Sequence, residues 1–119
     1  MSFSIFKKKD MTTTLIQNIT QWHRDRNLIE GSDDKSQFAK LIQEAGELSD
    51  NICKERDISD DIGDMMVVLI NIAERNELTL TQCLQKAYDD IKDRKGMMID
   101  GVFVKEEDVI RQGLGIPIK

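Results

Sequence analysis

Two pairs of acidic residues have the side-chain type and the spacing needed to hold metal ions. Glu44 and Glu47 form one pair, and Asp61 and Asp64 form the other, with two residues between the members of each pair. On a helix this spacing places both side chains on one face, with their Cβ atoms roughly 5–6 Å apart. Like charges at that distance repel, so a purely structural helix gains nothing from either pair. If the two helices pack antiparallel, the four carboxylates converge near a groove and can bind divalent cations through oxygen.

The rest of the composition limits which ion the site can hold. The chain has a single histidine, His23, and two cysteines, which is too few for the multi-histidine ligand sets of most zinc enzymes. We therefore expect Mg²⁺ or Mn²⁺ bound mainly by carboxylates. A calcium loop that starts at Asp57 is excluded, because Ile62 and Val68 stand where glycine and glutamate are required.

A solvated acidic surface is the simplest alternative explanation of the two pairs. The chain has 22 Asp and Glu residues against 17 Lys and Arg, so carboxylates three positions apart are common in it. Both pairs, however, border the apolar stripe of a predicted helix, and the two helices follow one another in the chain. This placement strengthens the case for a metal site, compared with a single pair, and leaves the surface interpretation open.

The elements that must position these residues are predicted to be helices. Apolar residues recur at helical spacing in four segments, which are residues 11–27, 35–55, 59–76 and 80–95. The third segment contains six consecutive apolar residues, Met65 to Ile70, so it must be buried on nearly every side, within this chain or by a second copy. After Gly96, Val102-Phe103-Val104 predicts a short strand or an extended arm. The expected fold class is all-α, a bundle of four to five helices with a short extended C-terminal arm.

Length and composition also exclude several kinds of protein. The 119 residues fit one domain, which we divide into a flexible N-terminal arm (1–10), a helical catalytic domain (11–96) and an extended C-terminal arm and tail (97–119). A net charge of −5 argues against non-specific binding of nucleic acid. No apolar run approaches the roughly 20 residues that cross a membrane. Cys53 and Cys83 are expected to be reduced thiols, and the amino terminus does not resemble a secretory signal, so we expect a cytoplasmic protein.

The acidic pairs belong to a longer pattern that resembles a known family. Lys40-Leu-Ile-Gln-Glu44-Ala-Gly-Glu47-Leu48, followed after a spacer by Asp61-Ile-Gly-Asp64, is similar to the signature of the MazG-like all-α nucleoside triphosphate pyrophosphohydrolases. The resemblance continues through Ile91-Lys92-Asp-Arg94-Lys95-Gly96 and covers about residues 12 to 104. The tail at Gly101-Val-Phe-Val104 resembles small phage members of the family. Asp61 stands where the family usually has Glu, and Gln43 stands where a further Glu is common.

This resemblance implies an activity and roles for the acidic residues. Members of the family hydrolyse a nucleoside or deoxynucleoside triphosphate between the α and β phosphates, giving a monophosphate and pyrophosphate. The resemblance implies that Glu44, Glu47, Asp61 and Asp64 bind Mg²⁺, and that Glu44 or Glu47 accepts the proton of the attacking water. A triphosphate is itself strongly negative, so an acidic groove accepts it only when cations lie between the two.

Other side chains are candidates for contacts with the substrate. Lys40, Lys92 and Arg94 could bind phosphates, although Lys40 could equally pair with Glu44, and the other two could simply favour a helix C-terminus. Trp22 could stack on a base, but its place in an apolar stripe favours a core role. Asn71 could contact the substrate, and the alternative that it bridges helices is favoured. His23 is expected to lie on the surface.

Two further expectations concern assembly and function. The apolar third helix predicts a homo-oligomer, either a dimer or a tetramer. We expect it to act in the cytoplasm of a bacterium or a phage-infected host, with a nucleoside triphosphate as the other partner. The alternatives to catalysis are a non-catalytic acidic helical interaction module and a nucleotide-binding regulator with the family fold.

Overall fold

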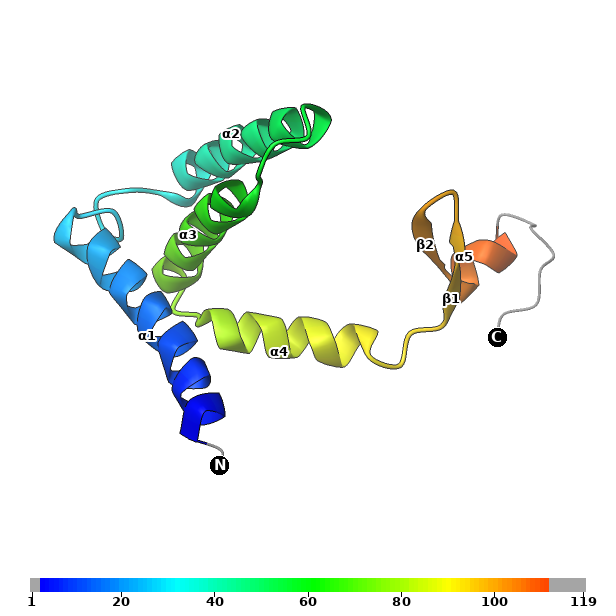
Figure 1. Cartoon of the computed structure of the whole chain (residues 1–119), viewed down its shortest axis with the longest axis horizontal. Helices are drawn as coiled ribbons and strands as arrows, with labels where there is room; N and C mark the ends of the chain where they lie inside the picture. Colours follow the sequence, from blue (N-terminus) through cyan, green and yellow to red (C-terminus); the bar gives the residue numbers. More distant parts are fainter. Residues whose placement is uncertain (1–2, 112–119) are drawn as a thin grey trace. The chain divides into compact units, whose positions relative to one another are not determined.

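The computed structural model describes residues 3–111, and their side chains from residue 11 onward. The described chain is mostly helical and forms two compact units that divide between Leu80 and Thr81. Figure 1 shows its elements, which are α1 (Phe3–Asp25), α2 (Asp34–Cys53), α3 (Ser59–Arg75), α4 (Leu80–Ile91), β1 (Gly96–Ile99), β2 (Val102–Lys105) and α5 (Glu106–Arg111). In the first unit, both α1 and α2 pack against α3. The all-α prediction is confirmed, apart from the small two-stranded sheet.

Aspartates fix the beginnings of the two helices that carry the acidic pairs. Asp33 precedes α2 in an extended conformation, and its carboxylate accepts hydrogen bonds from the backbone N–H and the hydroxyl of Ser36, at 2.7 and 3.0 Å. Asp57 accepts the same two kinds of hydrogen bond from Ser59, the first residue of α3. Both contacts satisfy N–H groups that have no partner within a helix. The predicted ranges 35–55 and 59–76 agree with α2 and α3 to within two residues.

Two predicted helix boundaries differ from the structure by more than two residues. Helix α1 begins at Phe3, eight residues before the predicted start, so residues 3–10 have helical backbone where a flexible arm was expected. Helix α4 ends at Ile91, four residues before the predicted end. The division of the chain into an N-terminal arm, a catalytic domain and a C-terminal arm stays a prediction.

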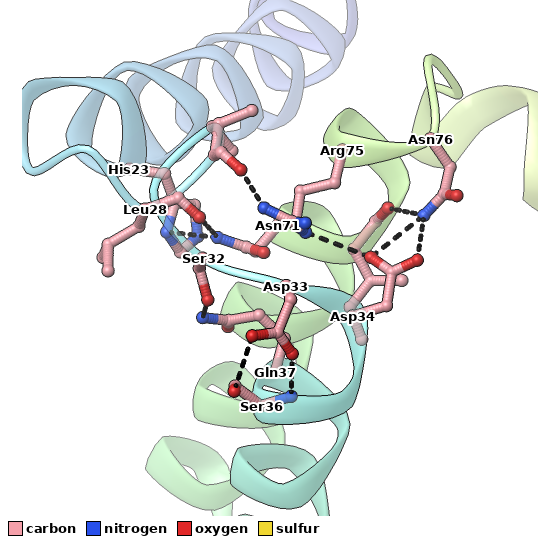
Figure 2. A network of polar contacts seen from close by, with 12 residues as sticks. His23, Leu28, Ser32, Asp33, Asp34, Ser36, Gln37, Asn71, Arg75 and Asn76 are labelled. Carbon is pink, nitrogen blue, oxygen red and sulfur yellow. Dashed lines mark hydrogen bonds and ion pairs between the residues drawn. The ribbon is translucent and has the colours of Figure 1, made fainter.

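A buried polar network, together with a small apolar core, joins the elements of the first unit. His23, at the end of α1, donates from Nε2 to the carbonyl of Val67 on α3, at 2.9 Å. The amide of Asn71 donates to the carbonyl of Leu28 at 2.9 Å and lies 3.2 Å from Nδ1 of His23 (Figure 2). Because the carbonyl oxygen of Val67 can only accept, His23 carries its proton on Nε2, and its Nδ1 accepts from the amide of Asn71. His23 is 3% exposed, so the expectation of a surface histidine is wrong.

The same network continues to the beginning of α2. Arg75 donates to the carbonyl of Ile29 and pairs with the carboxylate of Asp34 at 3.0 Å (Figure 2). Asn76 donates to the same carboxylate, at 3.2 and 3.3 Å. These contacts join the end of α3 to the beginning of α2. They therefore help to set how the two acidic helices lie against each other.

The second unit consists of α4, a hairpin and α5. Strands β1 and β2 are antiparallel, with Gly96 opposite Lys105 and Ile99 opposite Val102. Asp100 and Gly101 form the turn, and both have positive φ, as two-residue hairpin turns with the favoured twist require. Helix α5 packs on both strands and buries Val109, which is 1% exposed. Residues 97–111 of the predicted C-terminal arm are thus extended over these strands, but they fold back in a hairpin and then form a helix that was not predicted. The rest of the predicted arm and tail, residues 112–119, lies outside the described residues.

Candidate metal centre

Three carboxylates from two helices meet at one place in the first unit. Glu44 and Glu47 lie one turn apart on α2, and Asp64 lies on α3, which packs against α2. One oxygen of each carboxylate lies within 4.8 Å of the corresponding oxygens of the other two. Glu44 is buried, Asp64 is half-buried and Glu47 is exposed, so the group lies at an opening to solvent. We call Glu44, Glu47 and Asp64 the carboxylate cluster.

The Glu44 carboxylate is only partly compensated by the protein. Its Oε1 pairs with Nζ of Lys40 at 3.1 Å, the alternative contact that the sequence left open, and a role for Lys40 in phosphate binding stays a prediction. Its Oε2 is buried, and no donor among the described residues binds it. A buried carboxylate oxygen without a donor or a cation is costly. This oxygen is therefore chemically suited to bind an ion or a bound water.

Hydrogen bonding, burial and neighbouring negative charges raise the pKa values of two members of the cluster. The neighbouring Glu44 carboxyl, as a hydrogen-bond partner and then as a negative charge, raises the pKa of Glu47 above its ordinary value. Burial, followed by the negative charges of Asp60 and Glu44, raises the pKa of Asp64. In both cases Lys40 acts in the opposite direction but does not outweigh the carboxylates. The cluster therefore lacks positive charge, which a divalent cation would supply.

Asp61 lies outside the carboxylate cluster. It is 7% exposed, and its Oδ2 accepts a hydrogen bond of 2.9 Å from the side-chain amide of Asn51, on α2. Its negative charge is nevertheless one of the smaller contributions that raise the pKa values of Glu47 and Asp64. The structure thus brings three of the four predicted carboxylates together and places the fourth nearby with its own partner.

The remaining candidates in the first unit are placed differently. Trp22 is 44% exposed, and the guanidinium of Arg26 lies 4.3 Å from its ring centroid, so the favoured interpretation of Trp22 as a core residue is wrong. Asn71 is fully buried and joins α3 to α1 and to the loop after it, as the helix-bridging alternative predicted.

The two candidate cations of the second unit lie near the end of α4. Lys92 pairs with Asp89 at 3.7 Å. Arg94 lines a cavity of about 540 Å³ together with Lys95 and Lys105. A role for Lys92 and Arg94 in phosphate binding stays a prediction.

Two residues that received no functional role from the sequence, Asn51 and His23, make important contacts in the structure. Asn51 follows Glu47 by one helical turn, so the spacing alone places it beside the acidic pair. His23 continues the stripe of Ile16 and Ile19 toward α3, a signal that would have predicted its burial.

Comparison with known proteins identifies the family. The model of the MazG nucleotide pyrophosphohydrolase domain matches residues 33–98, a segment that contains all four predicted carboxylates and Asn51. The chain belongs to the MazG family. This membership agrees with the resemblance inferred from the acidic pairs and with a mostly helical fold. Within the MazG segment, the carboxylate cluster is formed by α2 and α3 alone.

A phage protein shares this MazG segment. The chain is 46% identical over 66 residues to an "Uncharacterized 18.2 kDa protein in rep-hol intergenic region" of Haemophilus phage HP1 (strain HP1c1). The aligned region covers 54% of this chain and 40% of the phage protein, so the chain spans well under half of its relative's length. No solved structure matches the chain.

Proposed function

We propose that the protein hydrolyses a nucleoside or deoxynucleoside triphosphate between the α and β phosphates, with Mg²⁺ or Mn²⁺ as cofactor. The observation that carries this proposal is the carboxylate cluster, in which a buried oxygen of Glu44 receives no hydrogen bond from the residues that the structure describes. Membership of the MazG family supports the reaction class. The oxygen-only ligand set suits Mg²⁺, which prefers a few carboxylates together with phosphate oxygens.

The reaction divides into tasks for the residues of the site. Glu44, Glu47 and Asp64 would hold the cation, with Asp61 nearby, and Lys40 limits the negative charge around them. When bound, the cation neutralises phosphate charge and lowers the pKa of a bound water. A water oxygen forms a bond to phosphorus, the bridging P–O bond between the α and β phosphates breaks, and pyrophosphate leaves. Glu47 is exposed and can accept the proton of that water, and Glu44 is the alternative acceptor.

The test is to identify the products. The purified protein is incubated with a panel of nucleoside and deoxynucleoside triphosphates and Mg²⁺, and phosphorus NMR follows the reaction. We expect a monophosphate and pyrophosphate, and no product with Glu47→Gln. Glu30→Gln, which changes an exposed carboxylate in the loop before α2, serves as the matched control and should leave the rate unchanged. Release of orthophosphate together with a nucleoside diphosphate would refute cleavage between the α and β phosphates. Nucleotide binding without turnover would indicate a regulator.

We also propose that the protein works as a homo-oligomer. In the second unit, Leu84, Tyr88 and Ile91 lie on one stripe of α4 and are 60%, 59% and 51% exposed. In the first unit, Phe38 and Ile42 of α2 are 55% and 56% exposed. Faces of this kind are usually covered by a partner.

The test of assembly is light scattering coupled to gel filtration. We expect the mass of a dimer or a tetramer, and a shift to the monomer for Leu84→Asp. The control Gln85→Asp, at the next position of α4, should not shift the mass. A monomeric wild-type protein at tens of micromolar would contradict the assembly.

The site of action is a further proposal. Among the described residues, no helix is long and apolar enough to cross a membrane. The phage relative supports a place in the cytoplasm of a bacterium or an infected host, where triphosphates are abundant.

A further inference from the structure

Asp61 is a buried carboxylate whose compensation is incomplete. It is 7% exposed, and among the described side chains it takes part in no ion pair. The first turn of α3 offers it the positive end of a helix dipole, and Asn51 offers it one neutral hydrogen bond. Neither contribution equals a full positive charge. A carboxylate this buried would be stabilised further by a cation close to it.

Asn51 is placed to decide where that carboxylate points. It lies on α2, one helical turn after Glu47, while Asp61 lies on α3, one turn before Asp64. The hydrogen bond of 2.9 Å therefore joins the two helices beside the carboxylate cluster and fixes one oxygen of Asp61. The Asp side chain has one methylene less than Glu, so it reaches less far and depends more on such a neighbour.

We propose that Asn51 is a positioning residue, which holds the buried Asp61 beside Glu44, Glu47 and Asp64 so that its charge strengthens cation binding by the cluster. This inference rests on the proposed metal site. In this role Asn51 acts through Asp61, to which its side-chain amide nitrogen donates, and not as a ligand of the cation or the nucleotide. Partners of this kind commonly change metal affinity ten- to hundredfold when they are removed.

The test measures cation binding in the absence of nucleotide. Mn²⁺ is titrated into the full chain and the free ion is followed by electron paramagnetic resonance. Asn51→Leu keeps the branching of the side chain at Cγ but removes the donor, and we expect the dissociation constant to rise roughly ten- to hundredfold. Gln21→Leu is the matched control, because the side-chain amide of Gln21 also donates to an aspartate, Asp25, but both residues lie on α1. The control should bind Mn²⁺ like the wild type.

A double-mutant cycle separates positioning from a general loss of structure. If Asn51 acts through Asp61, Asn51→Leu combined with Asp61→Asn should bind Mn²⁺ no more weakly than Asp61→Asn alone. A double variant that shows the sum of both losses would overturn the inference, as would an Asn51→Leu protein with unchanged affinity or an equal loss in Gln21→Leu. Failure of the metal site itself would look different, because wild type and Glu47→Gln would then bind Mn²⁺ equally weakly.

Turnover gives a second readout of the same inference. A loss of ion affinity should be corrected by excess Mg²⁺, so Asn51→Leu should need a higher Mg²⁺ concentration for half-maximal rate and then reach nearly the wild-type kcat. A kcat that stays low at saturating Mg²⁺ would contradict the positioning role.

Discussion

Replacement of Asp64 by Asn should make the metal-free protein more stable and the Mg²⁺-loaded protein less so. Asp64 has a raised pKa because burial and the charges of Asp60 and Glu44 disfavour its ionised form. Asparagine has nearly the same shape and removes the charge. The substitution therefore relieves a repulsion that exists only while no cation is bound.

The size of the effect follows from the distance between the carboxylates. Two unit charges 4.8 Å apart, the limit found for the oxygens of Glu44 and Asp64, repel by about 0.9 kcal/mol in bulk water and by about 3.5 kcal/mol near a protein surface of effective dielectric 20. Asp64 is half-buried beside an opening, so we expect a gain of about 1–2 kcal/mol, between these limits. For a domain of this size that gain corresponds to a rise in Tm of about 4–8 °C.

The assay is thermal unfolding of both proteins, first with EDTA and then with Mg²⁺. A cation at a hundred times its dissociation constant stabilises the folded state by about 2.7 kcal/mol, so Mg²⁺ should reverse the order of the two Tm values. Asp57→Asn is a control of opposite sign, because hydrogen bonds from the side chain and backbone of Ser59 lower the pKa of Asp57 and its charge is stabilising. A lower Tm for Asp64→Asn in EDTA, or an equal response of both proteins to Mg²⁺, would refute the reasoning.

Two further predictions concern pH and the buried network. In EDTA, the free energy of unfolding should fall as the pH rises from about 4. The reason is that Glu47 and Asp64 have raised pKa values and bind protons more tightly in the folded protein. Urea denaturation at several pH values measures this free energy, and a rise with pH would contradict the prediction. Asn71→Leu should lower the free energy of unfolding by about 1–3 kcal/mol, because the Leu28 carbonyl and His23 lose a buried donor. In the same urea assay, the exposed Asn18→Leu should change it by less than about 0.5 kcal/mol.

The sequence was sufficient to predict the helices that carry the site. Apolar spacing gave the ranges of α2 and α3, and the turn residues between them marked their beginnings. It also placed Glu44 and Glu47 on one face of a helix. These features depend on residues close together in the chain, where the geometry of a helix leaves few alternatives.

The packing between helices could not be derived in the same way. Asp61 and Asp64 share one face of α3, yet only Asp64 reaches the cluster, because the position of α2 decides which of the two lies opposite Glu44 and Glu47. Likewise, the expectation for His23 treated an imidazole as a surface group. Its burial depends on an acceptor, the carbonyl of Val67, and a donor, the side-chain amide of Asn71, and both residues lie more than forty positions away in the chain.

The arrangement of the cluster links stability and function through one interaction. The repulsion among the carboxylates destabilises the metal-free fold, and the attraction of the same carboxylates to a cation is what would bind the ion. Variants that neutralise a member, such as Asp64→Asn, should therefore gain stability as they lose cation affinity. Asn51→Leu differs, because it leaves every charge in place and removes a buried hydrogen bond, so it should lose affinity without gaining stability. The pattern across both variants thus separates a residue that holds the ion from one that positions its neighbour.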